Sequence, residues 1–297
     1  MRRNIQQARK GKISALVAAS GLVGALFFAG KEIHNDDTRM QQEAYASSKI
    51  SDYGTIVYEK NTDAPNMIYV LAQLHRVTST TINLSKNTPV AQRNIYHIGG
   101  ILVRERNVRL VLKEGRYASE DYTNKNALSR QQLERYGYGL EIFDNGAVEN
   151  AAVDNILSKN DNAFSASHLL ALKFPDVDLQ GWEDEVSLDK AMAAREKRIK
   201  DPADEAARAE YGYFKSIRTC NALLNAPEVA SREFGAGKVP NMNAAVVIGG
   251  GHVREMMSFL DNGHCYARPV GDSPKFVKAL DHYKNDFGVK IIVPKIE

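Results

Sequence analysis

The fold is decided by two stretches of sequence, MIYVLAQLHRVT at Met67–Thr78 and AAVVIGGGHVR at Ala244–Arg254. Within them, Ile68–Leu71 and Ala245–Ile248 are apolar at consecutive positions. Unbroken apolar runs of this length are typical of strands that are buried on both faces of a parallel sheet. We therefore predict that both stretches form central strands of one sheet.

Each predicted strand ends in the same local pattern. A small residue closes the apolar run and a histidine follows three positions later, as Ala72 and His75 in the first stretch and Gly249 and His252 in the second. Small residues let the chain turn sharply and approach a ligand closely. Ligands of open α/β sheets bind beyond the carboxyl ends of the strands, so both histidines are candidate site residues.

The rest of the chain alternates between strand and helix signals. Further β-rich runs lie at Thr55–Tyr58, Val108–Leu112, Leu140–Phe143 and Lys290–Val293. Helical periodicity is found at Pro89–Arg104, Ala147–Ser158, Ser187–Lys200 with Ser187 as N-cap, Ala203–Leu224 and Pro274–Asn285. This alternation predicts an α/β fold with a central, mostly parallel sheet, flanking helices and a helical insertion over about residues 150–225.

Composition and charge exclude several classes of protein. The chain has 297 residues, of which 43% are hydrophobic and 25% charged, as in globular proteins rather than disordered or collagen-like chains. Residues 1–12 carry five basic side chains and no acid, so the remaining chain carries −2 although the formal net charge is +3. A body without a basic excess is not expected to bind nucleic acid.

A run of 18 residues without charged side chains, Ile13–Gly30, follows this basic tail. The run is long enough for a transmembrane helix, and the charge on its N-terminal side predicts a cytoplasmic tail and an extracytoplasmic body. A cleavable signal peptide is the alternative, but phenylalanine occupies the −3 position of the cleavage sites at its end. We therefore favour a single-pass signal anchor, followed by a linker at residues 31–50 and an α/β domain at residues 51–297.

Three features leave alternatives open. Cys220 and Cys265 could form a disulfide outside the cytoplasm or remain two buried thiols. Glu255 lies three residues after His252, so it could support that histidine from one helix face or be a solvated helix charge. The acidic segment Phe174–Val186, which contains the single tryptophan, is predicted to be an exposed loop.

The paired strand-and-histidine pattern resembles a known superfamily, which includes the Tiki metalloproteases, the TraB proteins, the erythromycin esterases and the haem-uptake protein ChaN. VVIGGGHVREMMSFL is similar to the second G-x-x-H motif of this superfamily. VLAQLHRVTST is similar to the first motif, but it has Ala72 in place of the glycine and Gln73 at the glutamate or threonine position. The resemblance extends from about Met67 to Leu260.

Two further positions belong to the resemblance. The next strand of the family typically ends in a glutamate, and VRLVLKEG places Glu114 there. An arginine usually lies on a helix before the second histidine motif, and Arg218 in YGYFKSIRTCNALL is similar to it. The resemblance therefore implies a site made, in chain order, of His75, Glu114, Arg218 and His252.

These residue types are suited to two kinds of chemistry. His75, His252 and Glu114 could ligate a divalent metal such as Mn, Co or Zn, which activates water and polarises a carbonyl. Alternatively, one histidine serves as general base while Glu114 orients it or the water. Arg218 would bind a carbonyl or carboxylate oxygen or stabilise developing negative charge.

The resemblance implies a metal-dependent hydrolase that cleaves a peptide or ester bond in a peptide or small-molecule substrate, and the predicted anchor would hold it at the membrane. The alternative is a ChaN-like protein that binds haem or another small ligand without turnover, because Ala72 and Gln73 depart from the motif. Gln73 can bind through its amide but cannot act as a general base. A third reading is a catalytically degenerate membrane protein that retains the fold.

Overall fold

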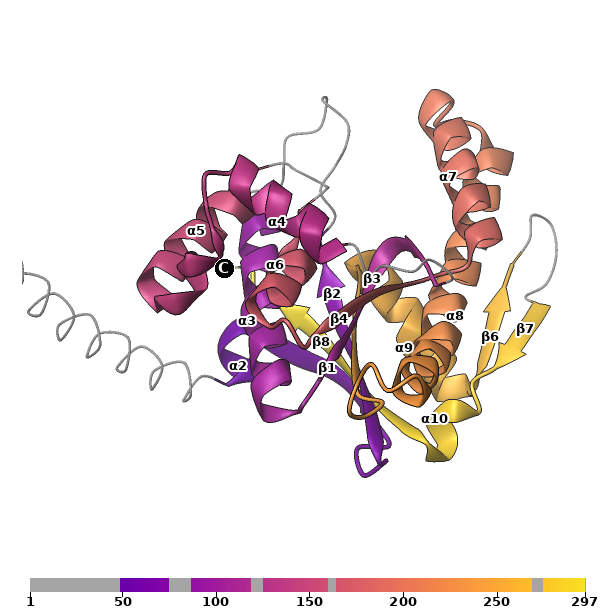
Figure 1. Cartoon of the computed structure of the whole chain (residues 1–297). Coiled ribbons are helices and arrows are strands. Elements are labelled where there is room, and N and C mark those ends of the chain that lie inside the picture. The colour runs from indigo at the N-terminus through magenta and orange to yellow at the C-terminus, as the bar shows by residue number, and fades with distance from the viewer. Residues whose placement is uncertain (1–48, 75–86, 119–124, 160–163, 269–274, 297) are drawn as a thin grey trace, which may run out of the picture.

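The computed structural model describes residues 49–74, 87–118, 125–159, 164–268 and 275–296. Its centre is a six-stranded sheet in the order β1-β8-β2-β5-β3-β4 (Figure 1). The strands of this sheet are β1 (Gly54–Lys60), β2 (Asn66–Gln73), β3 (Leu110–Tyr117), β4 (Asp178–Glu183), β5 (Ala244–Gly249) and β8 (Phe287–Pro294). A separate antiparallel pair is formed by β6 (His264–Ala267) and β7 (Lys275–Ala279).

The six-stranded sheet is mostly parallel, as predicted. β2 is parallel to β5 and β8, and β3 is parallel to β4 and β5. β1 lies at one edge and runs antiparallel to β8. The two central strands are β2 and β5, which contain the apolar runs Ile68–Leu71 and Ala245–Ile248.

Alternate side chains of the central strands face two hydrophobic cores. Ile68 and Val70 of β2 pack in one core with Val246 of β5, whereas Tyr69 and Leu71 pack in the other. None of the five is more than 4% exposed. Burial on both faces of the sheet explains why the runs Ile68–Leu71 and Ala245–Ile248 are apolar at every position.

Helices cover both faces of the sheet (Figure 1). The core that contains Leu71 is covered by α3 (Asn87–Glu105), α4 (Lys125–Arg135), α5 (Gly146–Ser158) and α6 (Ala166–Lys173). The core that contains Val70 is covered by α8 (Glu205–Gly235), α9 (Val253–Asn262) and α10 (His282–Asn285). The remaining helical segments are α2 (Ile50–Tyr53), η1 (Leu140–Asp144), η2 (Gly250–His252) and α7 (Glu185–Lys200).

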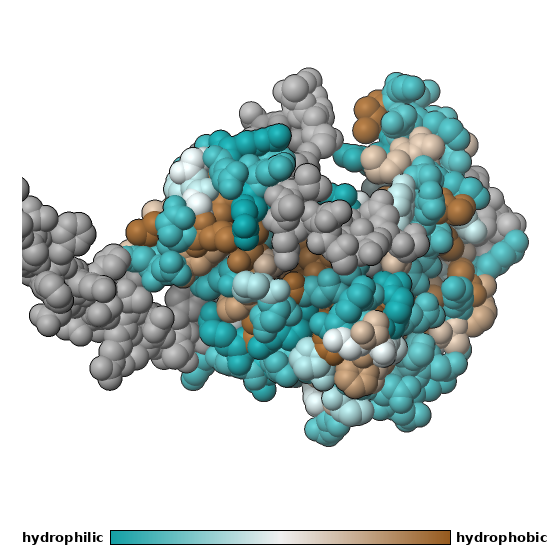
Figure 2. All heavy atoms as spheres, in the orientation of Figure 1, coloured by the Kyte–Doolittle hydropathy of each residue, from teal (hydrophilic) through white to brown (hydrophobic). Residues whose placement is uncertain are grey.

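α7 packs along α8 and stands out from the body of the molecule in Figure 1. Its visible surface is largely hydrophilic in Figure 2, with small apolar patches. Asp184 caps its first turn, because the Asp184 carboxylate accepts the backbone N–H of Ser187 at 2.8 Å. The prediction that Ser187 is the N-cap is therefore wrong by three residues.

Three predicted elements differ from the structure. Leu140–Phe143 lies in the 3-10 helix η1 rather than in a strand, because an apolar run of four residues does not distinguish the two. The predicted helix Pro274–Asn285 is wrong over residues 275–279, which form β7, since pairing with β6 overrides the helix signal. Phe174–Val186 contains the buried strand β4 instead of being an exposed loop, and its tryptophan, Trp182, is 0% exposed.

β4 also corrects the predicted helical insertion. It lies within residues 150–225 and pairs with β3 in the main sheet, so that range is not wholly helical. α3 and α5 agree with the predicted helices Pro89–Arg104 and Ala147–Ser158. α8 begins after its N-cap Asp204 and continues through Pro227 to Gly235, beyond the predicted end at Leu224.

Cys220 of α8 and Cys265 of β6 form a disulfide, and their Cα atoms are 5.6 Å apart. Of the two alternatives left open by the sequence, the structure therefore has the paired form, which ties α8 to the β6–β7 pair. No helix within the described ranges is long and apolar enough to cross a membrane. The predicted tail, the predicted anchor Ile13–Gly30 and nearly all of the predicted linker lie outside the described residues.

Candidate active site

The carboxyl ends of β2, β3 and β5 meet at one edge of the sheet. Gln73, the last residue of β2, pairs with Gly249, the last residue of β5. One strand further along, β3 brings Glu114 to the same edge. A cavity of about 300 Å³ opens there, and its lining includes Gln73, Glu114, Arg218 and His252. Three of the four predicted site residues therefore share one cavity.

Glu114 is held by donors from three different elements. Its Oε1 accepts a hydrogen bond from Nη2 of Arg218 at 2.9 Å. Its Oε2 accepts from the backbone N–H of Gly249 at 2.6 Å and from the side-chain amide of Gln73 at 3.4 Å. Because the Glu114 side chain is only 7% exposed, these donors replace the water that a carboxylate needs around it. The carboxylate is thereby fixed in the cavity.

Arg218 also binds a second glutamate, Glu183, which the sequence analysis missed. Nε of Arg218 donates to Oε2 of Glu183 at 3.0 Å, and Nη2 donates to Oε1. The backbone N–H of Gly115 donates to the same Oε1 at 3.2 Å. Glu183 lies at the carboxyl end of β4 with its side chain 0% exposed, so one guanidinium holds two carboxylates from neighbouring strands.

The protonation of this cluster reflects burial and charge together. Burial raises the pKa of Glu183, although its hydrogen bonds with Arg218 act in the opposite direction. Burial alone would lower the pKa of Arg218, but the hydrogen bonds and charges of Glu183 and Glu114 raise it overall. The guanidinium therefore remains charged at the floor of the cavity.

His252 is positioned between Glu114 and α8. Its Nε2 lies 3.8 Å from Oε1 of Glu114, and its Nδ1 lies 2.7 Å from the hydroxyl oxygen of Thr219. The same hydroxyl oxygen is 2.8 Å from Oε2 of Glu255 and 2.9 Å from the backbone oxygen of Lys215. The imidazole is 5% exposed and Thr219 is fully buried.

Counting protons at Thr219 determines the tautomer of His252. A hydroxyl group has one proton to donate. If Thr219 gave its proton to Nδ1 of His252, the Lys215 carbonyl and the Glu255 carboxylate would both face the hydroxyl oxygen with no hydrogen between them. The arrangement in which Thr219 accepts from His252 and donates to one of these oxygens is therefore favoured. Nδ1 of His252 therefore carries a proton. In the neutral ring the lone pair is on Nε2, the nitrogen that faces Glu114.

Glu255 supports His252 through Thr219 instead of being a solvated helix charge. Besides its bond to Thr219, its Oε1 accepts a hydrogen bond from the hydroxyl of Ser216, and its side chain is half-buried. The spacing of three residues after His252 was the signal in the sequence. It places Glu255 in the first turn of α9, where it faces α8.

Gln73 is oriented by a short chain of hydrogen bonds. Its side-chain oxygen accepts from the Gln92 amide at 3.1 Å, and the Gln92 oxygen accepts from the backbone N–H of Ala166 at 3.3 Å. The Gln73 nitrogen is therefore directed to Glu114. A glutamate at this position would put a second carboxylate against Glu114, so glutamine fits the surrounding hydrogen bonds.

α7 and the beginning of α8 supply the opposite wall of the cavity. The lining residues on these helices are Leu188, Ala191, Met192, Arg195 and Tyr211. The sequence did not indicate them, because they occupy ordinary positions of amphipathic helices. Only the packing of α7 on α8 brings them over the strand ends.

The described residues alone do not fit a metal site. Across the parts of the chain that the structure describes, no group of three or more His, Cys, Asp or Glu could hold a metal ion. The Glu114 oxygens already accept from Arg218 and Gly249, and a guanidinium at 2.9 Å opposes a second cation there. His75, the other predicted ligand, lies outside the described residues.

Comparisons with protein-family models, with curated proteins and with solved structures find no match to this chain. Its function is therefore inferred from the residues of the cavity and from the chemistry that they allow.

Proposed function

We propose that the chain is a hydrolase that cleaves a peptide or ester bond, with His252 as the general base. The observation that carries this proposal is the orientation of His252, whose Nδ1 is bound to Thr219 while Nε2 faces Glu114 in the cavity. General-base catalysis needs an imidazole held in one tautomer with its basic nitrogen directed to the reacting water.

In this reaction Nε2 of His252 takes a proton from a water molecule as the water oxygen attacks the substrate carbonyl. Glu114 stabilises the imidazolium that forms, because its Oε1 lies 3.8 Å from Nε2. The carbon–oxygen or carbon–nitrogen bond then breaks, and the imidazolium returns the proton to the leaving group. The products are an acid and an alcohol or amine.

Arg218 is suited to stabilise the carbonyl oxygen as it becomes negative. Its Nε and Nη2 donate to Glu183 and Glu114. Among the residues that the structure describes, Nη1 of Arg218 makes no hydrogen bond, and Arg218 lines the cavity. A donor that is held in place before the reaction stabilises an oxyanion without reorganising.

The metal-dependent form of the proposal adds His75 as a ligand beside His252 and Glu114. A bound divalent ion would lower the pKa of its water and polarise the carbonyl. Mn, Co and Zn are the ions to test. Because the described residues do not supply this site by themselves, metal dependence needs its own measurement.

We also propose that the domain acts outside the cytoplasm and is held at the membrane by Ile13–Gly30. The disulfide between Cys220 and Cys265 supports this location, because disulfides persist mainly in oxidising compartments. Mass spectrometry of the mature chain tests the anchor, since a chain that lacks Met1–Gly30 would contradict it.

The test of the reaction compares the full chain with its His252→Gln and His264→Gln variants on panels of chromogenic esters and fluorogenic peptides. His264 is an exposed histidine of β6, so its replacement controls for the loss of an imidazole. We expect His252→Gln to lower kcat by about 10²- to 10⁴-fold and His264→Gln to leave it unchanged. Unchanged turnover in His252→Gln would overturn the general-base assignment.

Metal content is measured on the same preparations, purified without chelator. One divalent ion per chain that is lost in a folded His75→Ala/His252→Ala variant would support the metal-dependent form. No bound metal after incubation with Mn, Co and Zn would remove that form and leave the general-base form in place. If no ester or peptide is cleaved, a haem titration tests the binding alternative through a visible absorption band that His252→Ala abolishes.

A further inference from the structure

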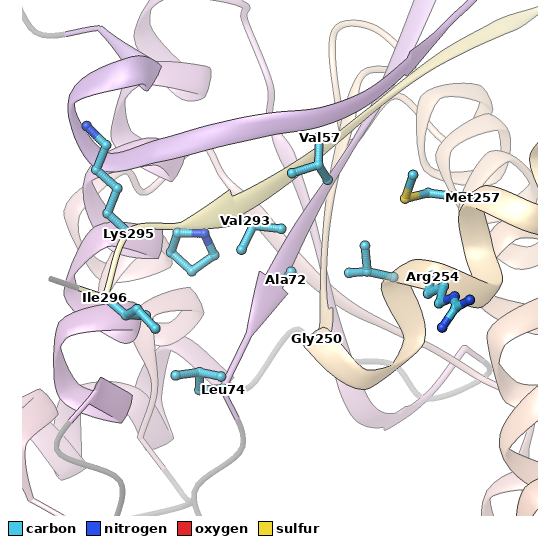
Figure 3. A pocket seen from close by; sticks show the side chains of 11 residues that line it. Val57, Ala72, Leu74, Gly250, Arg254, Met257, Val293, Lys295 and Ile296 are labelled. Carbon is cyan, nitrogen blue, oxygen red and sulfur yellow. The ribbon is translucent and has the colours of Figure 1, made fainter.

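A second and larger cavity is lined by Ala72 and Leu74, the chain neighbours of Gln73 (Figure 3). Its volume is about 750 Å³, within the usual range of small-molecule sites. It is bounded by the end of β2, the turn after β5, the start of α9, the end of β8 and the middle of β1.

The two cavities are separated by the backbone at the strand ends. Ala72 and Leu74 line the larger cavity, whereas Gln73 between them lines the smaller one. Successive side chains of a strand point to opposite faces, which explains this division. After β5, Gly250 and Val253 line the larger cavity. The larger cavity is therefore a separate compartment.

Small residues and a bulge create the hollow. Ala72 and Gly250 have almost no side chain to fill it, and a Cβ added to Gly250 would meet only the backbone oxygen of Gln73, at 3.5 Å. In β1, Ile56 pairs with Ile292 and Tyr58 with Ile291, so Val57 is an extra residue in the ladder. Bulges re-aim side chains, and this one places Val57 in the lining of the cavity.

The wall of the cavity is apolar. Val57 and Ile296 are each 40% exposed although both are large hydrophobic residues. Val293, Pro294 and Met257 complete this surface. Apolar surface that faces water in a concave site is stabilised when an aliphatic group covers it.

The charged residues among the described lining of the cavity have one sign. Arg254 and Lys295 are the charged residues of the lining, and among the described residues that line the cavity none is acidic. Figure 3 shows them at opposite ends, with their charged groups directed away from its centre. Long basic side chains place their stems along apolar surface and keep the charge in water. A ligand in this cavity therefore meets hydrocarbon inside and positive charge at the rim.

We propose that this cavity binds a long-chain carboxylate, with the aliphatic chain along Ala72, Val57 and Met257 and the carboxylate at Arg254 or Lys295. The apolar wall selects the chain, and the basic rim selects the anionic head. This site is independent of the hydrolase proposed above, since none of the lining residues that the structure describes takes part in that reaction.

The test uses the full chain reconstituted in phosphatidylcholine nanodiscs and two photoactivatable probes, a palmitate and the matching hexadecanol, each with a diazirine on the chain. After illumination, mass spectrometry locates the labelled peptides. We expect palmitate to label peptides that contain lining residues, which lie at Val57, Ala72–Leu74, Val253–Met257 and Val293–Ile296, and unlabelled palmitate to compete. Hexadecanol should label them at least about fivefold less.

Three variants complete the test. Val57→Trp should fill the cavity and lower palmitate labelling at least tenfold, whereas Val148→Trp, at an exposed valine of α5, should leave labelling unchanged. Arg254→Gln/Lys295→Gln should lower palmitate labelling about fivefold and leave the hexadecanol signal as it was. Equal labelling by both probes in the parent chain, no labelling of the peptides that contain lining residues, or labelling insensitive to Val57→Trp would each overturn the proposal.

Discussion

The hydroxyl group of Thr219 determines how His252 presents its two nitrogens. The hydroxyl can accept from Nδ1 only because its own proton is committed to Glu255 or to the Lys215 carbonyl. The basicity of Nε2 is thus directed to the cavity by a residue that does not line it. Thr219 is a positioning residue in the proposed reaction.

Thr219→Val should therefore destabilise the protein. Valine has nearly the shape of threonine but cannot accept the buried Nδ1–H of His252. An unsatisfied buried donor costs about 1–3 kcal/mol, so we expect the free energy of unfolding to fall by that amount. Urea denaturation measures it, and the fluorescence of Trp182, the single tryptophan, reports the transition.

Thr219→Ser is the matched control, because serine keeps the hydroxyl and removes one methyl group. If Thr219→Val loses turnover, Thr219→Ser should keep the turnover of the parent chain. If serine is as harmful as valine to both stability and turnover, then packing rather than the hydrogen bond explains the role of Thr219.

The sequence could identify some site residues and not others. His252 could be predicted because it belongs to a short motif at the end of an unmistakable strand. Glu114 and Arg218 could be predicted only through their order in the resemblance. Glu183 could not, because it precedes two further acids, and nothing local distinguishes the one that pairing of β4 with β3 buries.

At the scale of elements, the pairing of β4 with β3 brings Glu183, the second carboxylate partner, to Arg218. Gly181 in the middle of β4 lies against β3, and a Cβ added there would meet the backbone oxygens of Arg116 and Tyr117. Backbone atoms cannot move aside as a flexible side chain can. The approach of the two strands therefore requires glycine at this position.

Gly181→Ala should push β4 away from β3. We expect a loss of about 1–3 kcal/mol in the free energy of unfolding, which is typical of overpacking. The emission of Trp182 should shift to longer wavelength, since the adjacent indole becomes more exposed. Fluorescence spectra and urea denaturation measure the two effects.

Gly212→Ala is the control for this prediction. Gly212 lies within α8, and nothing lies within 4 Å of an added Cβ there. Alanine should stabilise that helix by about 0.5–1 kcal/mol. The argument from close approach fails if both alanine variants change stability in the same direction.

Strands made of unbroken apolar runs were easier to predict than strands that carry polar residues, for a physical reason. β2 and β5 are buried on both faces, so their own residues reveal them. β4, β6 and β7 carry polar residues, and each of them pairs with a neighbouring strand. Pairing between distant segments leaves little trace in local sequence, which is why a helix was predicted where β7 lies.

At the scale of the whole molecule, the disulfide links the site helix α8 to the β6–β7 pair. Reduction should lower the free energy of unfolding by about 2–4 kcal/mol, because the unfolded chain loses a cross-link between residues 45 positions apart. Urea denaturation with and without dithiothreitol measures this difference. A Cys220→Ala/Cys265→Ala variant should not respond to dithiothreitol, and equal sensitivity of both proteins would contradict the prediction.

The fold class was within reach of the sequence, because alternating strand and helix patterns and two fully buried strands specify a mostly parallel sheet. The order of the strands could not be predicted from the sequence, since it depends on which segments pair. The predictions for residues 1–48 remain predictions, as that region lies outside the described residues.

The bond between Cys220 and Cys265 also closes a covalent ring that contains β5, His252 and α9. A protease that cuts once inside this ring, for example in the exposed segment at residues 235–238, would leave both pieces attached to each other. A nicked chain would run as one band on a gel without reductant and as two with it. A single break in this part of the main chain would thus not separate His252 from Arg218, because the disulfide holds the two pieces together.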